Sequence, residues 1–105
     1  MDKILFAEDD RNLRQMAVDY LSAKGFAVTA VENGALAVEA AAGTAFDLIV
    51  LDVRMPVTDG LTACREIRAF SDTPVLFLSA LGERFAQCAG GLSELRIPKA
   101  GSSLR

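Results

Sequence analysis

Histidine and tryptophan are absent from this chain of 105 residues, and cysteine occurs only twice. Without histidine the chain cannot contain a Ser/His/Asp or Cys/His catalytic set, or a histidine that carries a phosphoryl group. Cys64 and Cys88 have neither C-x-x-C spacing nor a histidine nearby, so they predict neither a zinc site nor a redox motif. We expect two buried or half-buried thiols.

The chain also lacks a long apolar run and an excess of basic charge. Its apolar runs are too short to span a bilayer, and its first residues do not form a signal peptide, so we expect a cytoplasmic protein without a membrane partner. A net charge of −3 and a pI near 4.8 argue against direct binding of nucleic acid, because phosphate contacts need a basic face. The length and the 51% hydrophobic content predict one compact domain.

Short strand-like runs alternate with stretches of helical spacing. The strands are predicted at residues 4–7, 26–30, 47–51 and 75–78. Helices are predicted after Asp10, over about residues 35–42, and from Gly60 onward. The residues expected to face inward are Leu13, Met16, Ala17, Tyr20 and Leu21 in the first helix, and Leu61, Cys64, Ile67 and Phe70 in the third. This alternation favours an α/β fold with a doubly wound parallel sheet and helices on both faces.

The pattern weakens beyond about residue 85. Residues 84–91 could form one more helix, although two glycines would fray its end, and residues 95–97 could form a short fifth strand. Residues 100–105 are too short and too polar for a packed final helix. The sequence therefore predicts that the final helix is missing or altered.

Three of the apolar runs end in polar side chains. Glu8 and Asp9 follow the first run, Asp52 follows the third, and Ser79 follows the fourth. The carboxyl ends of parallel strands share one sheet edge, which is where open α/β sheets bind ligands. Because clustered carboxylates repel each other until a divalent cation joins them, the sequence predicts a magnesium site with a hydroxyl beside it.

These side chains have plainer interpretations as well. Asp9 with Asp10 could be an acidic pair at a helix N-terminus, and Ser79 could be a turn hydroxyl at a strand end. Asp52 directly follows four apolar residues, which is rare for a cap, and we expect its carboxylate to be exposed at the strand end. Such an aspartate can attack phosphorus and form an acyl phosphate.

Three segments resemble the receiver domain of bacterial two-component response regulators. They read ILFAEDD at residues 4–10, LIVLDVRMP at 48–56 with Asp59-Gly60 after it, and VLFLSA at 75–80. The resemblance covers residues 1 to about 84, so residues 1–105 would be one receiver domain with an atypical end at 85–105. It implies a flavodoxin-like sheet with strand order 2-1-3-4-5.

The resemblance also implies a metal-dependent phosphorylation. Asp52 would be the phosphoacceptor. Magnesium would be held by Asp9 directly, by Glu8 largely through water, by Asp52 and by the backbone carbonyl of Arg54. Such a domain is not an enzyme beyond catalysing its own phosphorylation and dephosphorylation. Its partner would be a sensor histidine kinase or a phosphotransfer protein.

The switch region matches the family only in part. Ser79 would be the switch hydroxyl, and Ala80 the small residue that leaves room for the phosphoryl group. Receivers normally continue with an aromatic residue on the fifth strand, a Lys-Pro pair and a long last helix. Here proline precedes Lys99, and no aromatic residue follows Phe85. Lys99 is the only candidate for the phosphate-binding lysine, and it could equally be a solvated tail residue.

An altered last helix would leave part of the sheet uncovered. We expect Ile4, Phe6 and Ile97 to be exposed there, and this face to be covered by self-association into a homo-oligomer, by strand or helix exchange, or by a partner. Two further functions compete with a phosphoacceptor domain. A degenerate receiver would act as an interaction module that does not switch. An aspartate-nucleophile phosphatase or phosphotransferase would need an acid/base carboxylate two residues after Asp52, where the chain has Arg54.

Overall fold

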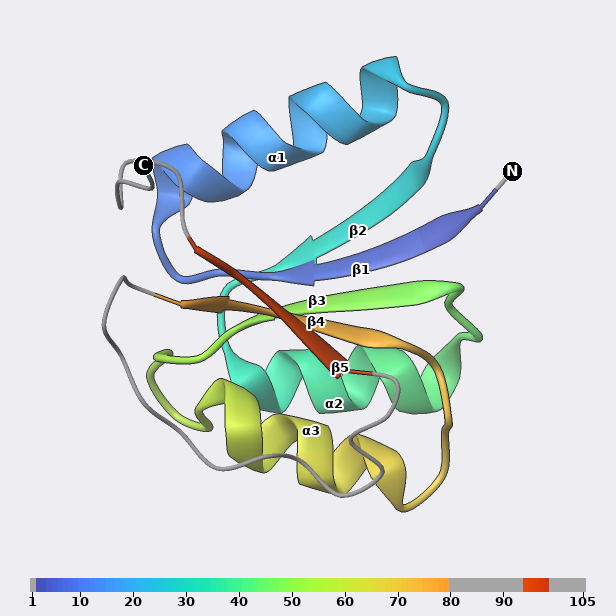
Figure 1. The fold of residues 1–105 in the computed structure, drawn as a ribbon, viewed down its shortest axis with the longest axis vertical. Helices are drawn as coiled ribbons and strands as arrows, with labels where there is room; N and C mark the ends of the chain where they lie inside the picture. The colour runs from blue at the N-terminus through green and yellow to red at the C-terminus, as the bar shows by residue number, and fades with distance from the viewer. Residues whose placement is uncertain (1, 80–93, 99–105) are drawn as a thin grey trace.

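The computed structural model describes the backbone of residues 2–79 and 94–98, and the side chains of residues 2–78. Its five parallel strands form one sheet in the order β2-β1-β3-β4-β5 (Figure 1). The strands are β1 Lys3–Ala7, β2 Ala27–Val31, β3 Leu48–Asp52, β4 Val75–Ser79 and β5 Glu94–Pro98. The predicted parallel sheet, its strand order and a short fifth strand are confirmed.

Three helices connect the first four strands: α1 Arg11–Ala23, α2 Gly34–Gly43 and α3 Gly60–Arg68. Each begins at a side chain that accepts a backbone N–H of the first turn; these caps are Asp10, Asn33 and Asp59. α1 lies on one face of the sheet, and α2 and α3 lie on the other (Figure 1). None of the helices in the described ranges is long and apolar enough to cross a bilayer. The candidate helix at 84–91 and the end at 100–105 fall outside those ranges.

The larger core lies between the sheet, α2 and α3. Its buried residues are Leu5, Ala7, Ala37, Phe46, Ile49, Leu51, Val53, Ala63, Cys64, Ile67, Val75 and Phe77. Cys64 and Ile67 face inward as predicted, but Phe70 is 48% exposed because α3 ends at Arg68. The expected thiol at Cys64 is also wrong, since its sulfur is disulfide-bonded. Spacing along the chain does not reveal such a pairing, and Cys88 lies outside the described residues.

A smaller core lies under α1. Ile4 and Phe6 are only 3% and 6% exposed, so their expected exposure is wrong. Ala17 and Leu21, one helical turn apart, pack against this core, whereas Met16 and Tyr20 are 60% and 62% exposed. α1 therefore covers the sheet with a narrower stripe than predicted.

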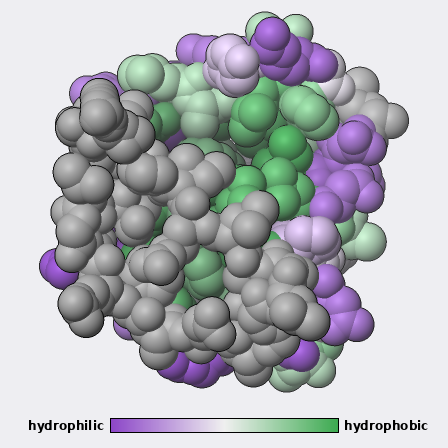
Figure 2. Space-filling view, in the orientation of Figure 1, coloured by the Kyte–Doolittle hydropathy of each residue, from purple (hydrophilic) through white to green (hydrophobic). Residues whose placement is uncertain are grey.

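The expected homo-oligomer gains no support from the described face. With Ile4 and Phe6 buried, its premise fails for both of these residues, and the side chain of Ile97 lies outside the described ranges. Some apolar surface remains: Leu48, Leu76 and Leu78 are only partly buried on this side. Figure 2 shows hydrophobic residues gathered near the centre of one view of the molecule.

Candidate metal centre

Three carboxylates meet at the carboxyl edge of the sheet. Ala7 of β1 pairs with Leu51 of β3, so Glu8, directly after β1, and Asp52, the last residue of β3, lie at the ends of neighbouring strands. One oxygen each from Glu8, Asp9 and Asp52 lies within 4.8 Å of the others. Oxygen ligands from carboxylates are the donors that Mg²⁺ takes in proteins, so the donor set fits this ion.

The three acidic residues between β1 and α1 have two different structural roles. The side chain of Asp10 caps α1, because its Oδ1 accepts the N–H groups of Asn12 at 2.9 Å and Leu13 at 3.1 Å. Glu8 is fully buried, and its Oε2 accepts the N–H of Asp10 at 3.0 Å. The capping interpretation therefore holds for Asp10, while Glu8 and Asp9 belong to the carboxylate cluster.

Asp52 is far less accessible than expected. It is 1% exposed, against the predicted exposure at the strand end. The reason is its place in the sheet: Asp52 is still paired with Leu78 of β4, and the next residue, Val53, donates its N–H to the Leu78 carbonyl at 3.0 Å. Asp9 is the one exposed member of the cluster.

The loop between β3 and α3 folds back over Asp52. The Arg54 N–H donates to Asp52 Oδ1 at 3.3 Å, and the Gly60 N–H donates to the Val53 carbonyl at 2.9 Å. A Cβ atom at Gly60 would overlap the Asp52 carbonyl, so only glycine fits there. Asp52 and Gly60 belong to the same sequence signature, and in the structure Gly60 packs against the backbone carbonyl of Asp52. The metal-binding role of the Arg54 carbonyl stays a prediction.

The same loop contains a feature that the sequence did not indicate. Val57 has a φ of +70°, and the Thr58 N–H donates to the Pro56 carbonyl at 2.8 Å, which makes a tight three-residue turn. A Cβ atom at Gly34 would overlap the Thr58 carbonyl, so the start of α2 packs tightly against this loop.

Sequence reasoning also missed Arg14, which is a basic neighbour of the cluster. Arg14 Nη1 donates to the backbone carbonyl of Glu8 at 2.8 Å and reaches that of Asp9 at 3.5 Å. The signal was available, because helical side chains lean toward the N-terminus and cover the preceding turn. An arginine four residues after the cap at Asp10 can reach back to the acidic turn.

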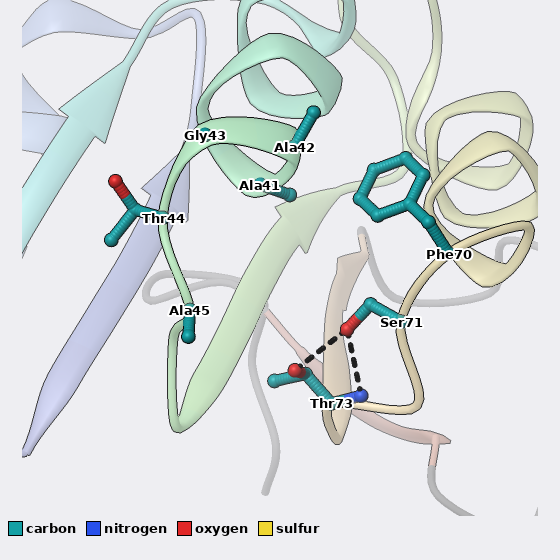
Figure 3. A pocket seen from close by; sticks show the side chains of 8 residues that line it. All are labelled: Ala41, Ala42, Gly43, Thr44, Ala45, Phe70, Ser71 and Thr73. Atoms are coloured by element: carbon teal, nitrogen blue, oxygen red, sulfur yellow. Dashed lines mark hydrogen bonds between the residues drawn. The ribbon is translucent and has the colours of Figure 1, made fainter.

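The opposite, amino-terminal edge has a hollow of another kind. An open groove of about 620 Å³ lies between the end of α2 and the segment before β4 (Figure 3). Its lining residues are Ala41, Ala42, Gly43, Thr44, Ala45, Phe70, Ser71 and Thr73. The hydroxyl groups of Ser71 and Thr73 form a hydrogen bond, with 2.8 Å between their oxygens. None of the described residues that line this groove has an ionisable side chain, so the ionisable groups that cluster among the described residues lie at the carboxyl edge instead.

Comparison with known proteins agrees with this geometry. Residues 4–90 match the model of the response regulator receiver domain. The chain is 42% identical over 88 residues to the transcriptional regulatory protein BaeR of Escherichia coli, which covers 84% of this chain and 37% of BaeR. It is 38% identical over 88 residues to ResD of Bacillus subtilis, with the same two coverages. The chain thus belongs to the receiver domains of two-component response regulators, and it spans little more than a third of these relatives.

Solved receiver structures have the same fold. One is the receiver domain of the sensor histidine kinase PA1611 of Pseudomonas aeruginosa, with magnesium coordinated in its active-site cleft; the TM-score is 0.84 at 31% identity, over 94% of this chain and 85% of that one. Another is TrrA of Thermotoga maritima in complex with Mg²⁺ and BeF, with a TM-score of 0.83 at 26% identity, over 96% and 89% of the two chains. TrrA has also been solved in complex with the histidine kinase ThkA.

Proposed function

We propose that this receiver domain accepts a phosphoryl group on Asp52 in a magnesium-dependent reaction, and that phosphorylation switches its binding to a partner. The observation that carries the proposal is the convergence of Glu8, Asp9 and Asp52 within 4.8 Å at the carboxyl edge. A buried group of like charges is costly unless a cation joins it, which gives the cluster a reason to bind Mg²⁺.

The chemistry follows from the placement of Asp52. A carboxylate oxygen of Asp52 attacks the phosphorus of the donor, and the bond from phosphorus to the donor's leaving atom breaks, which leaves an acyl phosphate. Glu8, Asp9, Asp52 and the Arg54 carbonyl would hold Mg²⁺, with Asp9 binding directly and Glu8 largely through water. When bound, Mg²⁺ neutralises charge on the transferring oxygens. The Arg54 N–H orients Asp52 by donating to Oδ1.

Other parts of the proposal rest on the family. Ser79 would be the switch hydroxyl, Ala80 would leave room for the phosphoryl group, and Lys99 would bind phosphate; their side chains lie outside the described residues. The donor would be a sensor histidine kinase or a phosphotransfer protein in the cytoplasm, consistent with the solved complex of TrrA with ThkA. The domain would comprise residues 1–105.

A receiver that no longer switches is the second candidate. The observation in its favour is the 1% exposure of Asp52, because a phosphodonor has to reach this carboxylate. The exposed Asp9 marks the side from which a donor would approach. An interaction module would keep the fold but no longer switch; in the form that the burial of Asp52 favours, it would not be phosphorylated.

Intact mass spectrometry after incubation with acetyl phosphate and Mg²⁺ separates these candidates. We expect a gain of one phosphoryl group in the wild-type chain and none in Asp52→Asn. Asp47→Asn is the matched control, since Asp47 immediately precedes β3, whereas Asp52 ends it. It should be phosphorylated like the wild type. A folded wild-type chain that gains no mass would favour the interaction module, and a gain in Asp52→Asn would place the chemistry elsewhere.

A further inference from the structure

We propose that Arg14 is a positioning residue for the magnesium site, acting through the backbone of Asp9. This inference rests on the proposed function, because it concerns the affinity of the same carboxylate cluster for Mg²⁺. Arg14 does not belong to the cluster. It contacts the turn that presents the cluster, through hydrogen bonds to backbone carbonyls.

The direction of the Asp9 carboxylate depends on its backbone. Among the described residues, the Asp9 side chain makes no hydrogen bond, and it is exposed. Glu8 and Asp10 on either side are held: the Glu8 N–H donates to the Val31 carbonyl at 3.1 Å, and the Asp10 N–H donates to Glu8 Oε2 at 3.0 Å. The backbone of this turn therefore sets where Asp9 points.

Arg14 contacts the turn on both sides of the Asp9 Cα. The Glu8 carbonyl belongs to the peptide group before Asp9, and the Asp9 carbonyl belongs to the peptide group after it. Nη1 of Arg14 donates to the first at 2.8 Å and lies 3.5 Å from the second. The 2.8 Å bond holds the peptide plane before Asp9, and the longer contact lies against the plane after it. Together they limit the backbone dihedrals of Asp9, which suits the near-ideal geometry that Mg²⁺ demands.

The charge of Arg14 has the opposite effect on Mg²⁺ affinity. A cation close to the cluster reduces its negative potential, which by itself weakens binding of Mg²⁺. Removing the guanidinium therefore tightens Mg²⁺ binding if charge dominates and weakens it if positioning dominates. The sign of the change distinguishes the two effects.

The test is a Mg²⁺ titration followed by thermal unfolding, which gives a dissociation constant without any phosphorylation. Arg14→Met should raise the Kd for Mg²⁺ about tenfold, as expected for losing a charged hydrogen bond. Arg14→Lys keeps the charge but replaces the rigid, planar guanidinium with an ammonium on a flexible stem, and should raise the Kd about threefold. Arg11→Met is the matched control, because exposed Arg11 is in the same helical turn and makes no hydrogen bond or ion pair within the described part of the chain. It should leave the Kd within about twofold, since exposed charges are screened.

A second readout separates positioning from a general loss of stability. At saturating Mg²⁺, the rate of phosphorylation of Arg14→Met by acetyl phosphate should return to within about twofold of the wild type, because only metal affinity is impaired. A Kd equal to or lower than that of the wild type overturns the positioning role, and so does a rate that stays low. If Arg14→Met does not fold, an unchanged Kd in Arg14→Lys is decisive against it. A wild-type chain without any Mg²⁺-dependent shift overturns the proposed function itself.

Discussion

Two aspartates, Asp47 directly before β3 and Asp52 at its end, show how the two edges of the sheet differ. Asp47, before β3, is exposed; its N–H donates to the Lys3 carbonyl and its Oδ2 accepts the Lys3 N–H, both at 2.8 Å. Asp52, at the end of β3, is 1% exposed and lies beside two other carboxylates. Asp47 joins the start of β3 to the start of β1 through hydrogen bonds. Asp52 is buried beside like charges, where its negative charge is unfavourable. Changes at the amino edge should therefore alter stability alone, and changes at the carboxyl edge should alter metal and phosphoryl chemistry.

The largest expected difference in the free energy of unfolding is between alanine substitutions at two glycines, Gly60 and Gly43. A Cβ atom at Gly60 would overlap the Asp52 carbonyl, whereas a Cβ atom at Gly43 would meet nothing within 4 Å. Gly60→Ala should lower the free energy of unfolding by about 3 kcal/mol through overpacking. Gly43→Ala, at the end of α2, should raise it by up to about 1 kcal/mol, because alanine favours the helix. Urea denaturation of both variants checks this, and a Gly60→Ala chain as stable as the wild type would contradict the packing.

Metal affinity should depend unequally on the members of the cluster. Asp9→Asn should weaken Mg²⁺ binding by at least about tenfold, and Glu8→Gln by less, because Asp9 is assigned direct contact with the ion. Asp10→Asn is a matched control, since it removes the same charge from the next residue and asparagine caps helices as well as aspartate. Calorimetric titration should show only a small change for this control. Equal, negligible effects of Asp9→Asn and Glu8→Gln would remove the site.

The two aspartates beside β3 should also differ in the sign of their effect on stability. In EDTA, Asp52→Asn should raise the free energy of unfolding by roughly 1 kcal/mol, because it removes a buried charge from a group of like charges. Asp47→Asn should lower it by about 0.5–1 kcal/mol, because a hydrogen bond to a charged acceptor is weakened. Saturating Mg²⁺ should remove the advantage of Asp52→Asn. A loss of stability in both variants would show that repulsion within the cluster is negligible.

The smallest effect is expected at Val57. A β-branched residue is strained at a φ of +70°, and glycine is not. Val57→Gly should raise the free energy of unfolding by up to about 0.5 kcal/mol, because relief of strain slightly exceeds the added entropy of the unfolded chain. Val57→Ala keeps the Cβ and should give no gain. If glycine and alanine at this position have the same effect, the turn is not strained.

The sequence predicts the fold correctly where a local pattern, such as a short apolar run, determines the structure of a segment. Apolar runs predicted β1, β3 and β4, and parallel pairing then brings Glu8 and Asp52 to one edge. The burial of Asp52 was missed because it depends on how far β4 extends beside β3. Met16 and Tyr20 were assigned inward because a helical period does not fix the width of the covered stripe. Arg14 acts on backbone atoms of an earlier turn, which no pattern of residue types displays.

Locating the phosphoryl group on the chain is the most direct test of the carboxyl edge as a phosphoacceptor site. After incubation with acetyl phosphate and Mg²⁺, borohydride reduces an aspartyl phosphate to homoserine, and tryptic peptides are then sequenced by mass spectrometry. Residues 25–54 form one tryptic peptide that contains both Asp47 and Asp52, so each is the other's internal control. We expect homoserine at position 52 alone, and only when Mg²⁺ is present. Homoserine at position 47, at position 9 or nowhere in the chain would contradict the proposed role of Asp52.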